Sequence, residues 1–272
     1  MKRKSWLFLA GYAAGALLLS YLLARLAIHD RMAEVPLLWS TCAKALLILL
    51  ILYYAKVSGA DKYLLCGRTF TRDALWLLLP LVASWMVYYG TPNTRPEILT
   101  FVMTLLGVVS GVVWEELYFR FLARLLFERC GKYHLLALVL TSVVYGLSQL
   151  FRAMYQPVGI GAGMMLFIFA TAQGVFLTAL YSKTKNILFP LCAHLLQDVA
   201  EVLFHSFSTQ PTGVFGRGDI FEGLLAIAYT AVGFWFLFFS HHIRERRHKV
   251  PPVNGDADTP DQTAEPKDGL SA

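Results

Sequence analysis

Charged side chains are scarce in this chain of 272 residues, of which only 15% are Asp, Glu, Lys or Arg. Hydrophobic residues make up 57% of the chain, whereas about half is usual for soluble domains. The mean hydropathy is correspondingly high, at +0.54. This composition excludes an ordinary soluble domain and indicates a membrane protein.

The chain also lacks the short motifs that mark several common enzyme classes. It contains no P-loop, no glycine-rich dinucleotide fingerprint, no HExxH pair and no internal repeat. Its four cysteines show no metal-ligand or redox spacing, so disulfides are not expected. Basic loops that face anionic lipid account for the net charge of +6, and no nucleic-acid partner is expected.

Long apolar runs predict an all-α, polytopic membrane bundle, because a helix needs about 20 mostly apolar residues to cross the hydrocarbon. Such continuous runs do not show the alternation of a membrane barrel strand. We expect about eight transmembrane helices, near Trp6–Ala24, Pro36–Ala55, Ala74–Gly90, Ile98–Leu117, Leu135–Leu150, Val158–Tyr181, Ile187–Phe204 and Phe221–Ser240.

Lysine and arginine predict the orientation, because they collect in cytoplasmic loops. The first apolar stretch is longer than that of a typical cleaved secretory signal, so we expect an uncleaved membrane anchor. Residues 1–250 are expected to form the bundle, with both termini cytoplasmic, in the inner membrane of a bacterial cell. Residues 251–272 are rich in Pro, Asp and Gly and predict a disordered acidic tail. The basic residues that predict the cytoplasmic side are Lys2, Arg3, Lys4, Lys56, Lys62, Arg68, Arg72, Arg124, Arg129, Lys132, Lys183, Lys185, Arg244, Arg246, Arg247 and Lys249.

A few polar residues lie inside the predicted spans. A charged group there costs a few kcal/mol or more unless it is paired, so each one is a candidate functional residue. For Lys44, in the second span, the alternatives are that its ammonium reaches out to the membrane surface or pairs with Glu201 or with a backbone carbonyl. The set is Lys44, Glu115, Glu116, Arg120, Gln149, His194, Asp198, Glu201 and His205.

The fourth and fifth spans should form an antiparallel hairpin that turns near Lys132. Glu115 and Gln149 each lie about 17 residues from that turn, which places them at one level across the hairpin. His194 and Asp198 are one turn apart in the seventh span, at a similar depth. We therefore expect these four residues to line one polar cavity that opens towards the cytoplasm.

The spacing also separates the two adjacent glutamates. Glu116 and Arg120 are four residues apart and can pair along one helical face, whereas Glu115 points about 100° away, towards the cavity. A carboxylate there can act as a general base on water. His194 can polarise a carbonyl, shuttle a proton or bind metal, and Asp198 can orient it. These roles fit amide hydrolysis; buried ion pairs that hold helices together, or a transporter cavity, are the alternatives.

Three motifs, in the fourth, fifth and seventh predicted spans, resemble the CPBP family of intramembrane proteases, which includes type II CAAX prenyl endopeptidases and bacteriocin-processing or immunity proteins. They are Glu115-Glu-Leu-Tyr-Phe-Arg120, Tyr145-Gly-Leu-Ser-Gln149 and His194-Leu-Leu-Gln-Asp198, within a family-like core of about residues 98–204. The resemblance implies a water activated by Glu115, with Glu116 and Arg120 as a supporting pair and His194 with Asp198 assisting. It also implies a divalent metal such as zinc, held by His194 and Glu115, as one form of the mechanism.

The second motif departs from the family pattern, because Gln149 occupies the position of an expected histidine. Glutamine does not titrate and is a poor metal ligand, but its amide can donate a hydrogen bond to an oxyanion. Two functions follow. The protein is either an endopeptidase that cuts a peptide or membrane-anchored substrate near the cytoplasmic face, or a catalytically impaired relative that acts as a scaffold, immunity factor or regulator.

Overall fold

The computed structural model describes residues 3–32, 38–65, 74–88, 98–127, 134–153, 160–203 and 223–237. Within these ranges every regular element is a helix, and each of the eight predicted apolar segments contains one. The predicted acidic tail, residues 251–272, and His205 lie outside the described residues.

Among the described residues, four helices are long and apolar enough to cross a membrane: Trp6–Asp30, Leu38–Val57, Phe101–Phe127 and Gly161–Thr184. The prediction of an all-α, polytopic helical membrane protein is therefore confirmed. Four further apolar helices are shorter, at 10–17 residues: Leu75–Ser84, Leu135–Phe151, Leu188–Ala200 and Gly223–Leu237.

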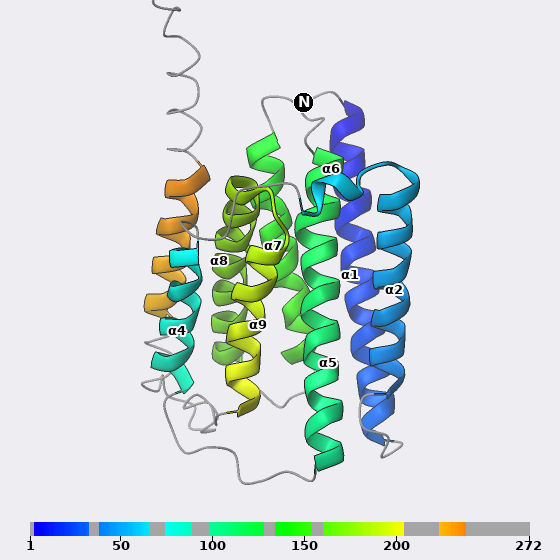
Figure 1. Cartoon of the computed structure of the whole chain (residues 1–272), viewed down its shortest axis with the longest axis vertical. Coiled ribbons are helices and arrows are strands. Elements are labelled where there is room, and N and C mark those ends of the chain that lie inside the picture. Colours follow the sequence, from blue (N-terminus) through cyan, green and yellow to red (C-terminus); the bar gives the residue numbers. More distant parts are fainter. Residues whose placement is uncertain are drawn as a thin grey trace, which may run out of the picture.

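The helices stand side by side along one direction (Figure 1). α1 and α2 lie on one side of α5, and α4 with the C-terminal helix Gly223–Leu237 lies at the opposite edge, beyond α8 and α9. The bounds are α1 (Arg3–Met32), α2 (Leu38–Val57), η1 (Asp61–Tyr63), η2 (Ala74–Leu77), α4 (Leu78–Tyr88), α5 (Ile98–Glu116), η3 (Leu117–Leu122), α6 (Ala123–Phe127), α7 (His134–Ala153), α8 (Ile160–Thr184) and α9 (Leu188–Leu203).

Two of the three buried apolar clusters in the described part of the bundle enclose the candidate residues. One joins α1, α2, the α5–α6 segment and α7, and includes Trp114, Phe121 and Tyr145. The other joins α4, α8, α9 and the C-terminal helix around Phe176 and Phe189. The candidate polar residues of α5 and α9 lie where the two clusters meet, so helix packing from both sides fixes their positions.

α7 and α8 pack closely because glycine lies at their interface, as is common between membrane helices. A Cβ atom added at Gly146 would overlap the side chain of Thr171 and would lie 2.9 Å from the carbonyl oxygen of Phe167. At Gly174, such an atom would be 3.1 Å from the Cβ atom of Ser142. α7, which carries the second motif, is therefore held tightly against α8.

The hairpin of α1 and α2 is closed by a buried carboxylate. The first N–H groups of a helix have no partner within the helix and need a cap. Asp30, which is fully buried, accepts hydrogen bonds from the backbone N–H groups of Trp39 (3.2 Å) and Ser40 (2.9 Å). A side chain of α1 therefore caps the first turn of α2.

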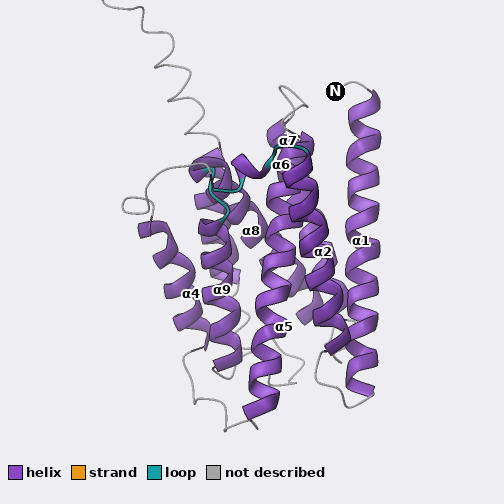
Figure 2. Ribbon diagram, turned by 45° about the vertical axis from the view of Figure 1, so that its right-hand side comes forward, coloured by secondary structure: helices purple, strands orange, loops and turns teal. Residues whose placement is uncertain are grey.

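One end of the bundle gathers the described loops that carry basic residues. The N–H group of Ile187 donates to the carbonyl of Leu64 at 2.9 Å, which joins the loop after α8 to the loop after α2. At the same end Arg124 of α6 donates to the carbonyl of Tyr181 at 3.3 Å. Figure 2 shows these loops beside α6 and the start of α7.

Candidate functional site

The helix that carries the first motif changes its winding directly after the two glutamates. Residues Leu117–Leu122 form a π-helical segment, in which the N–H group of Ala123 bonds to the carbonyl of Tyr118, five residues earlier. The hydroxyl of Tyr12 in α1 donates to the same carbonyl at 3.1 Å, and the hydroxyl of Tyr118 donates to the carbonyl of Tyr12 at 3.3 Å. Such wider turns occur often at functional sites.

Glu116 lies at the centre of the polar cluster and is completely buried. Its Oε2 atom is 3.4 Å from Nε of Arg120, so the predicted pair is present. Its Oε1 atom is 2.8 Å from Nδ1 of His194, a contact that the sequence did not predict. One carboxylate thus joins the first motif to the third across the interface between α5 and α9.

Arg120 is also supported from α7. Its guanidinium carbon lies 4.4 Å from the centre of the Tyr145 ring, and the arginine is 1% exposed. Attraction between a cation and an aromatic face adds to the ion pair in a site from which water is excluded. Tyr145, the aromatic residue of the second motif, therefore contacts Arg120, which the spacing of the motifs did not predict.

The imidazole of His194 is fixed by this arrangement. Because the carboxylate of Glu116 can only accept, we assign the ring hydrogen to Nδ1, which leaves Nε2 as the acceptor of the neutral ring. Three oxygen atoms surround Nε2: the hydroxyl of Tyr145 at 3.3 Å, Oδ1 of Asp198 at 3.6 Å and Oε2 of Glu115 at 3.9 Å. A proton taken up at Nε2 would lie near the carboxylates of Glu115 and Asp198.

Glu115 and Gln149 face each other, as the hairpin predicted. The amide nitrogen of Gln149 donates to Oε1 of Glu115 at 3.2 Å. The side chain of Glu115 is 14% exposed, whereas that of Glu116 is 0% exposed. Of the two adjacent glutamates, Glu115 is thus the one that reaches open space, and the other is enclosed by protein.

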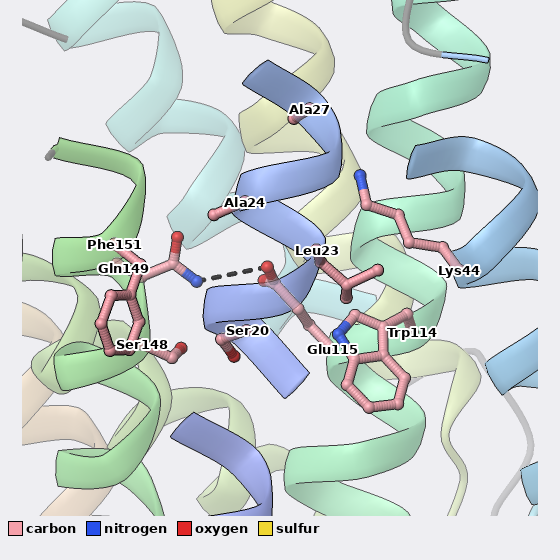
Figure 3. Close-up of a pocket in the computed structure, with 10 residues that line it drawn as sticks. All are labelled: Ser20, Leu23, Ala24, Ala27, Lys44, Trp114, Glu115, Ser148, Gln149 and Phe151. Carbon is pink, nitrogen blue, oxygen red and sulfur yellow. Dashed lines mark hydrogen bonds between the residues drawn. The ribbon is translucent and has the colours of Figure 1, made fainter. Parts of the chain in front are cut away.

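That space is a pocket of about 100 Å³ between α1, α2, α5 and α7 (Figure 3). It has room for more than one water molecule, since each occupies roughly 30 Å³ in the liquid. His194 is buried behind Glu115, at 2% exposure, and Asp198 lies one turn further along α9. The residues around the pocket are Ser20, Leu23, Ala24, Ala27, Lys44, Trp114, Glu115, Ser148, Gln149 and Phe151.

The remaining candidates have different outcomes. Lys44 donates to the carbonyl of Gly107 at 3.3 Å, so the carbonyl that was one of its two expected partners is present. The side chain of Glu201 is not among those described. The walls that α1 and α2 give to the pocket were not predicted, because their contributing residues are mostly small or apolar and carry no motif.

The site residues all fall within one recognisable segment. Residues 97–200 match a family model described as type II CAAX prenyl endopeptidase Rce1-like. The chain contains an Rce1-like domain of the CPBP family. The predicted resemblance is confirmed for this segment. Searches among curated proteins and among solved structures found no match.

The Rce1-like domain runs from α5 into α9 and leaves α1, α2, α4 and the C-terminal helix outside. All six predicted site residues lie inside it: Glu115, Glu116, Arg120, Gln149, His194 and Asp198. One side of the pocket, by contrast, comes from α1 and α2. The Rce1-like domain therefore supplies the polar residues, and the helices before it complete the walls around them.

The donor atoms of the Rce1-like domain do not fit the metal that the family resemblance implied. In the described part of the chain, no group of three or more His, Cys, Asp or Glu side chains is arranged to hold a metal ion. Nδ1 of His194 is directed to Glu116, and the amide nitrogen of Gln149 faces Glu115 in place of an imidazole. Both residues that the resemblance assigned to a metal are thus hydrogen-bonded to other side chains.

Proposed function

We propose that the protein is an intramembrane endopeptidase in which Glu115 activates water for attack on a peptide bond. The observation that supports this function best is the position of Glu115. Its carboxylate reaches a pocket with room for water, one of its oxygens accepts a hydrogen bond from Gln149, and His194 lies behind it. Membership of the Rce1-like family supports the same reaction class.

The chemistry uses groups already in place. Glu115 takes a proton from water, and the hydroxide oxygen bonds to the carbonyl carbon of the substrate, whose oxygen becomes an oxyanion. The amide of Gln149 carries two N–H groups, so that it can donate to the oxyanion as well as to Glu115. When the C–N bond breaks, the proton held by Glu115 passes to the leaving amine, and an acid and an amine are released.

In this proposal Glu116 and Arg120 are positioning residues. Glu116 fixes the ring of His194, and Arg120 balances the charge of Glu116. His194 then directs Nε2 towards Glu115 and Asp198. A proton on Nε2 would counter the negative charge that builds up in the transition state, which is the largest single contribution in many hydrolases.

We further propose eight membrane crossings, with both termini and the site nearer the cytoplasm of a bacterial cell. The described basic residues Lys56, Arg124 and Lys185 support this, because they gather at one end of the bundle. His194 lies about 9 Å along α9 from that end, at 1.5 Å per residue. A substrate would thus meet the site from the half of the membrane that faces the basic loops.

The test is a quantitative comparison of membrane peptides between cells that carry the wild type and cells that carry Glu115→Gln. This change keeps the size of the side chain and removes the base. We expect a set of peptides with one common cleavage site to disappear. Asp61→Asn, an exposed change near Lys56, is the matched control and should leave the peptides unaltered. Identical peptides in wild type and Glu115→Gln would refute the function.

Gln149 favours a second candidate, a family member without catalysis that acts as a membrane scaffold, immunity factor or regulator. Gln149→His distinguishes the two. A gain of proteolysis from an inactive wild type would indicate the impaired relative. If the wild type is active and the histidine variant loses activity, the hydrogen bond from Gln149 to Glu115 belongs to a site adapted to glutamine.

A further inference from the structure

Two buried tyrosines join α1 to the π-helical segment Leu117–Leu122. The hydroxyl of Tyr12 donates to the carbonyl of Tyr118 at 3.1 Å, and the hydroxyl of Tyr118 donates to the carbonyl of Tyr12 at 3.3 Å. Their rings stack with centres 5.0 Å apart. Tyr12 is 6% exposed and Tyr118 is 8% exposed. A buried hydroxyl without a partner is costly, so this exchange of hydrogen bonds fixes α1 against the segment.

The carbonyl of Tyr118 is the point at which the winding of the helix changes. In a regular α-helix this carbonyl would accept from the N–H group of Leu122, four residues later. Here it accepts from Ala123, five residues later, and from the hydroxyl of Tyr12. A carbonyl oxygen has two lone pairs, so it can accept both hydrogen bonds. Because a side chain that inserts into the hydrogen-bond ladder can make a helix irregular, Tyr12 supports the wider turn from outside.

α1 also leaves room for the hydroxyl of Tyr118. A Cβ atom added at Gly15 would lie 3.3 Å from that oxygen, which is closer than an ordinary contact. A Cβ atom added at Gly11 would meet no described atom within 4 Å. Gly15 therefore lets the Tyr118 hydroxyl approach the backbone of α1.

The wider turn affects how the first motif is oriented. One additional residue in a turn rotates the residues that follow, relative to those before it, by up to about 100°. Glu116 precedes the π-helical segment, and Arg120 lies within it. Nε of Arg120 is 3.4 Å from Glu116, and the guanidinium carbon is 4.4 Å from the centre of the Tyr145 ring. The winding thus brings one guanidinium to a carboxylate of α5 and to a ring of α7.

We propose that Tyr12 is a positioning residue, whose bond to the Tyr118 carbonyl keeps the wider turn that places Arg120. α1 lies outside the Rce1-like domain, so the domain depends on a helix before it for the geometry of its first motif. The effect on peptide cleavage rests on the proposed endopeptidase function. α1 lines the pocket from Ser20 onwards, about two turns beyond Tyr12, so Tyr12 affects the rate of cleavage and not the binding of substrate.

Solid-state NMR of the full-length chain in lipid bilayers measures the winding and the arginine without catalysis. Tyr118-Phe119 is the only Tyr-Phe pair in the sequence, and Arg120-Phe121 is the only Arg-Phe pair. Carbonyl-¹³C tyrosine combined with ¹⁵N-phenylalanine therefore assigns the carbonyl signal of Tyr118. Uniformly ¹³C,¹⁵N-labelled arginine with the same phenylalanine assigns Arg120, and its own carbon chain leads to the Nε signal.

Tyr12→Phe keeps the ring and removes the hydroxyl. We expect the carbonyl signal of Tyr118 to move upfield by more than its line width, because the carbonyl loses a hydrogen bond. The Nε signal of Arg120 should shift in the same variant. Tyr21→Phe is the matched control, because it is the same change at an exposed position of α1, and it should move neither signal.

A second pair of variants decides the question even where Tyr12→Phe fails to fold. Gly15→Ala displaces the hydroxyl of Tyr118 and should shift both signals. Gly11→Ala makes the same change in the same helix without a contact and should leave both signals in place.

Cleavage of a substrate found by the membrane peptide comparison gives a further measurement. We expect Tyr12→Phe to lower kcat by about three- to ten-fold, as for one lost hydrogen bond, with KM unchanged. Asp30→Ala, which removes the cap of α2 from the same helix, should retain kcat. A general loss of stability would lower the activity of both variants.

A Tyr118 signal that stays in place in Tyr12→Phe would overturn the proposal. So would an Arg120 signal that stays while the Tyr118 signal moves, or a wild-type kcat in Tyr12→Phe. Failure of the endopeptidase function is recognised separately, by membrane peptides that do not depend on Glu115. In that case the two NMR signals still decide whether Tyr12 places Arg120.

Discussion

Replacing Glu116 with glutamine removes one charge from the centre of the site and keeps the shape of the side chain. The carbonyl oxygen of the new amide can still accept from Nδ1 of His194, at the place where Oε1 is now 2.8 Å away. Its NH₂ group would then face Nε of Arg120, where Oε2 is now 3.4 Å away. Arg120 would remain buried, at 1% exposure, beside a donor in place of an anion.

The effect of Glu116→Gln on the free energy of unfolding follows from this geometry. Removing one partner of a buried ion pair costs roughly 3 to 5 kcal/mol, chiefly because the other charge is left without compensation. The ring of Tyr145 offsets part of that cost, since a cation over an aromatic face is worth about 0.5 to 2 kcal/mol. We therefore expect Glu116→Gln to lower the free energy of unfolding by about 2 to 4 kcal/mol.

Denaturation in mixed detergent micelles measures this quantity, and a second substitution isolates its cause. Glu116→Gln combined with Arg120→Gln removes both charges, and most of the lost stability should return. Peptide cleavage should stay low in the double variant, because an amide orients His194 but does not balance a proton on its ring. If Glu116→Gln lowers the free energy of unfolding by less than about 1 kcal/mol, or if the double variant is no more stable than Glu116→Gln, the reasoning about the buried pair is refuted.

Three further changes test other parts of the structure. Tyr145→Phe removes the hydroxyl near Nε2 of His194 and keeps the ring under the arginine, so kcat should fall while the unfolding midpoint stays nearly constant. Gly146→Ala should destabilise the protein by about 1 to 3 kcal/mol through overlap with α8, whereas Gly161→Ala, which meets nothing within 4 Å, should not destabilise it; detergent denaturation measures both. Asp30→Ala should cost about 0.5 to 2 kcal/mol by the same measurement, because two N–H groups of α2 lose their cap.

Sequence reasoning predicted the parts of the site that depend on counting along a helix. The hairpin turn near Lys132 placed Gln149 opposite Glu115 because both helices rise by the same distance per residue. The spacing of four residues predicted the pair of Glu116 and Arg120 for the same reason. Apolar run length predicted where helices occur, because burial in lipid depends on composition more than on order.

The parts that were missed depend on contacts between distant segments. Glu116 was assigned only to Arg120, although a carboxylate has two oxygens and the packing of α9 brings His194 to the second one. The π-helical segment after Glu116 has no signature in its own residues and is held by Tyr12 of α1. Lys44 was a candidate functional residue, but its place in the same pocket as Glu115 was not predicted, because that place depends on how α2 packs near Gly111.

The length of an apolar run also predicted too much at α4. The apolar run Ala74–Gly90 predicted one continuous span, but the described part begins with the short turn η2 and continues as α4, Leu78–Tyr88. Hydropathy depends on which residues are apolar and not on their backbone conformation. It therefore does not distinguish a helix that crosses the membrane from a shorter helix with a turn before it. The same holds for the Leu188–Ala200 helix that carries His194.

The central claim is that the Glu115 carboxylate activates a water in the pocket. Its most direct test is cleavage, in ¹⁸O-labelled water, of a substrate found by the membrane peptide comparison, with purified full-length protein. We expect the wild type to release a product with one ¹⁸O atom in its new carboxylate, and Glu115→Gln to lower that rate by a factor of about 10² or more. Labelled product formed by Glu115→Gln at the wild-type rate would contradict the account.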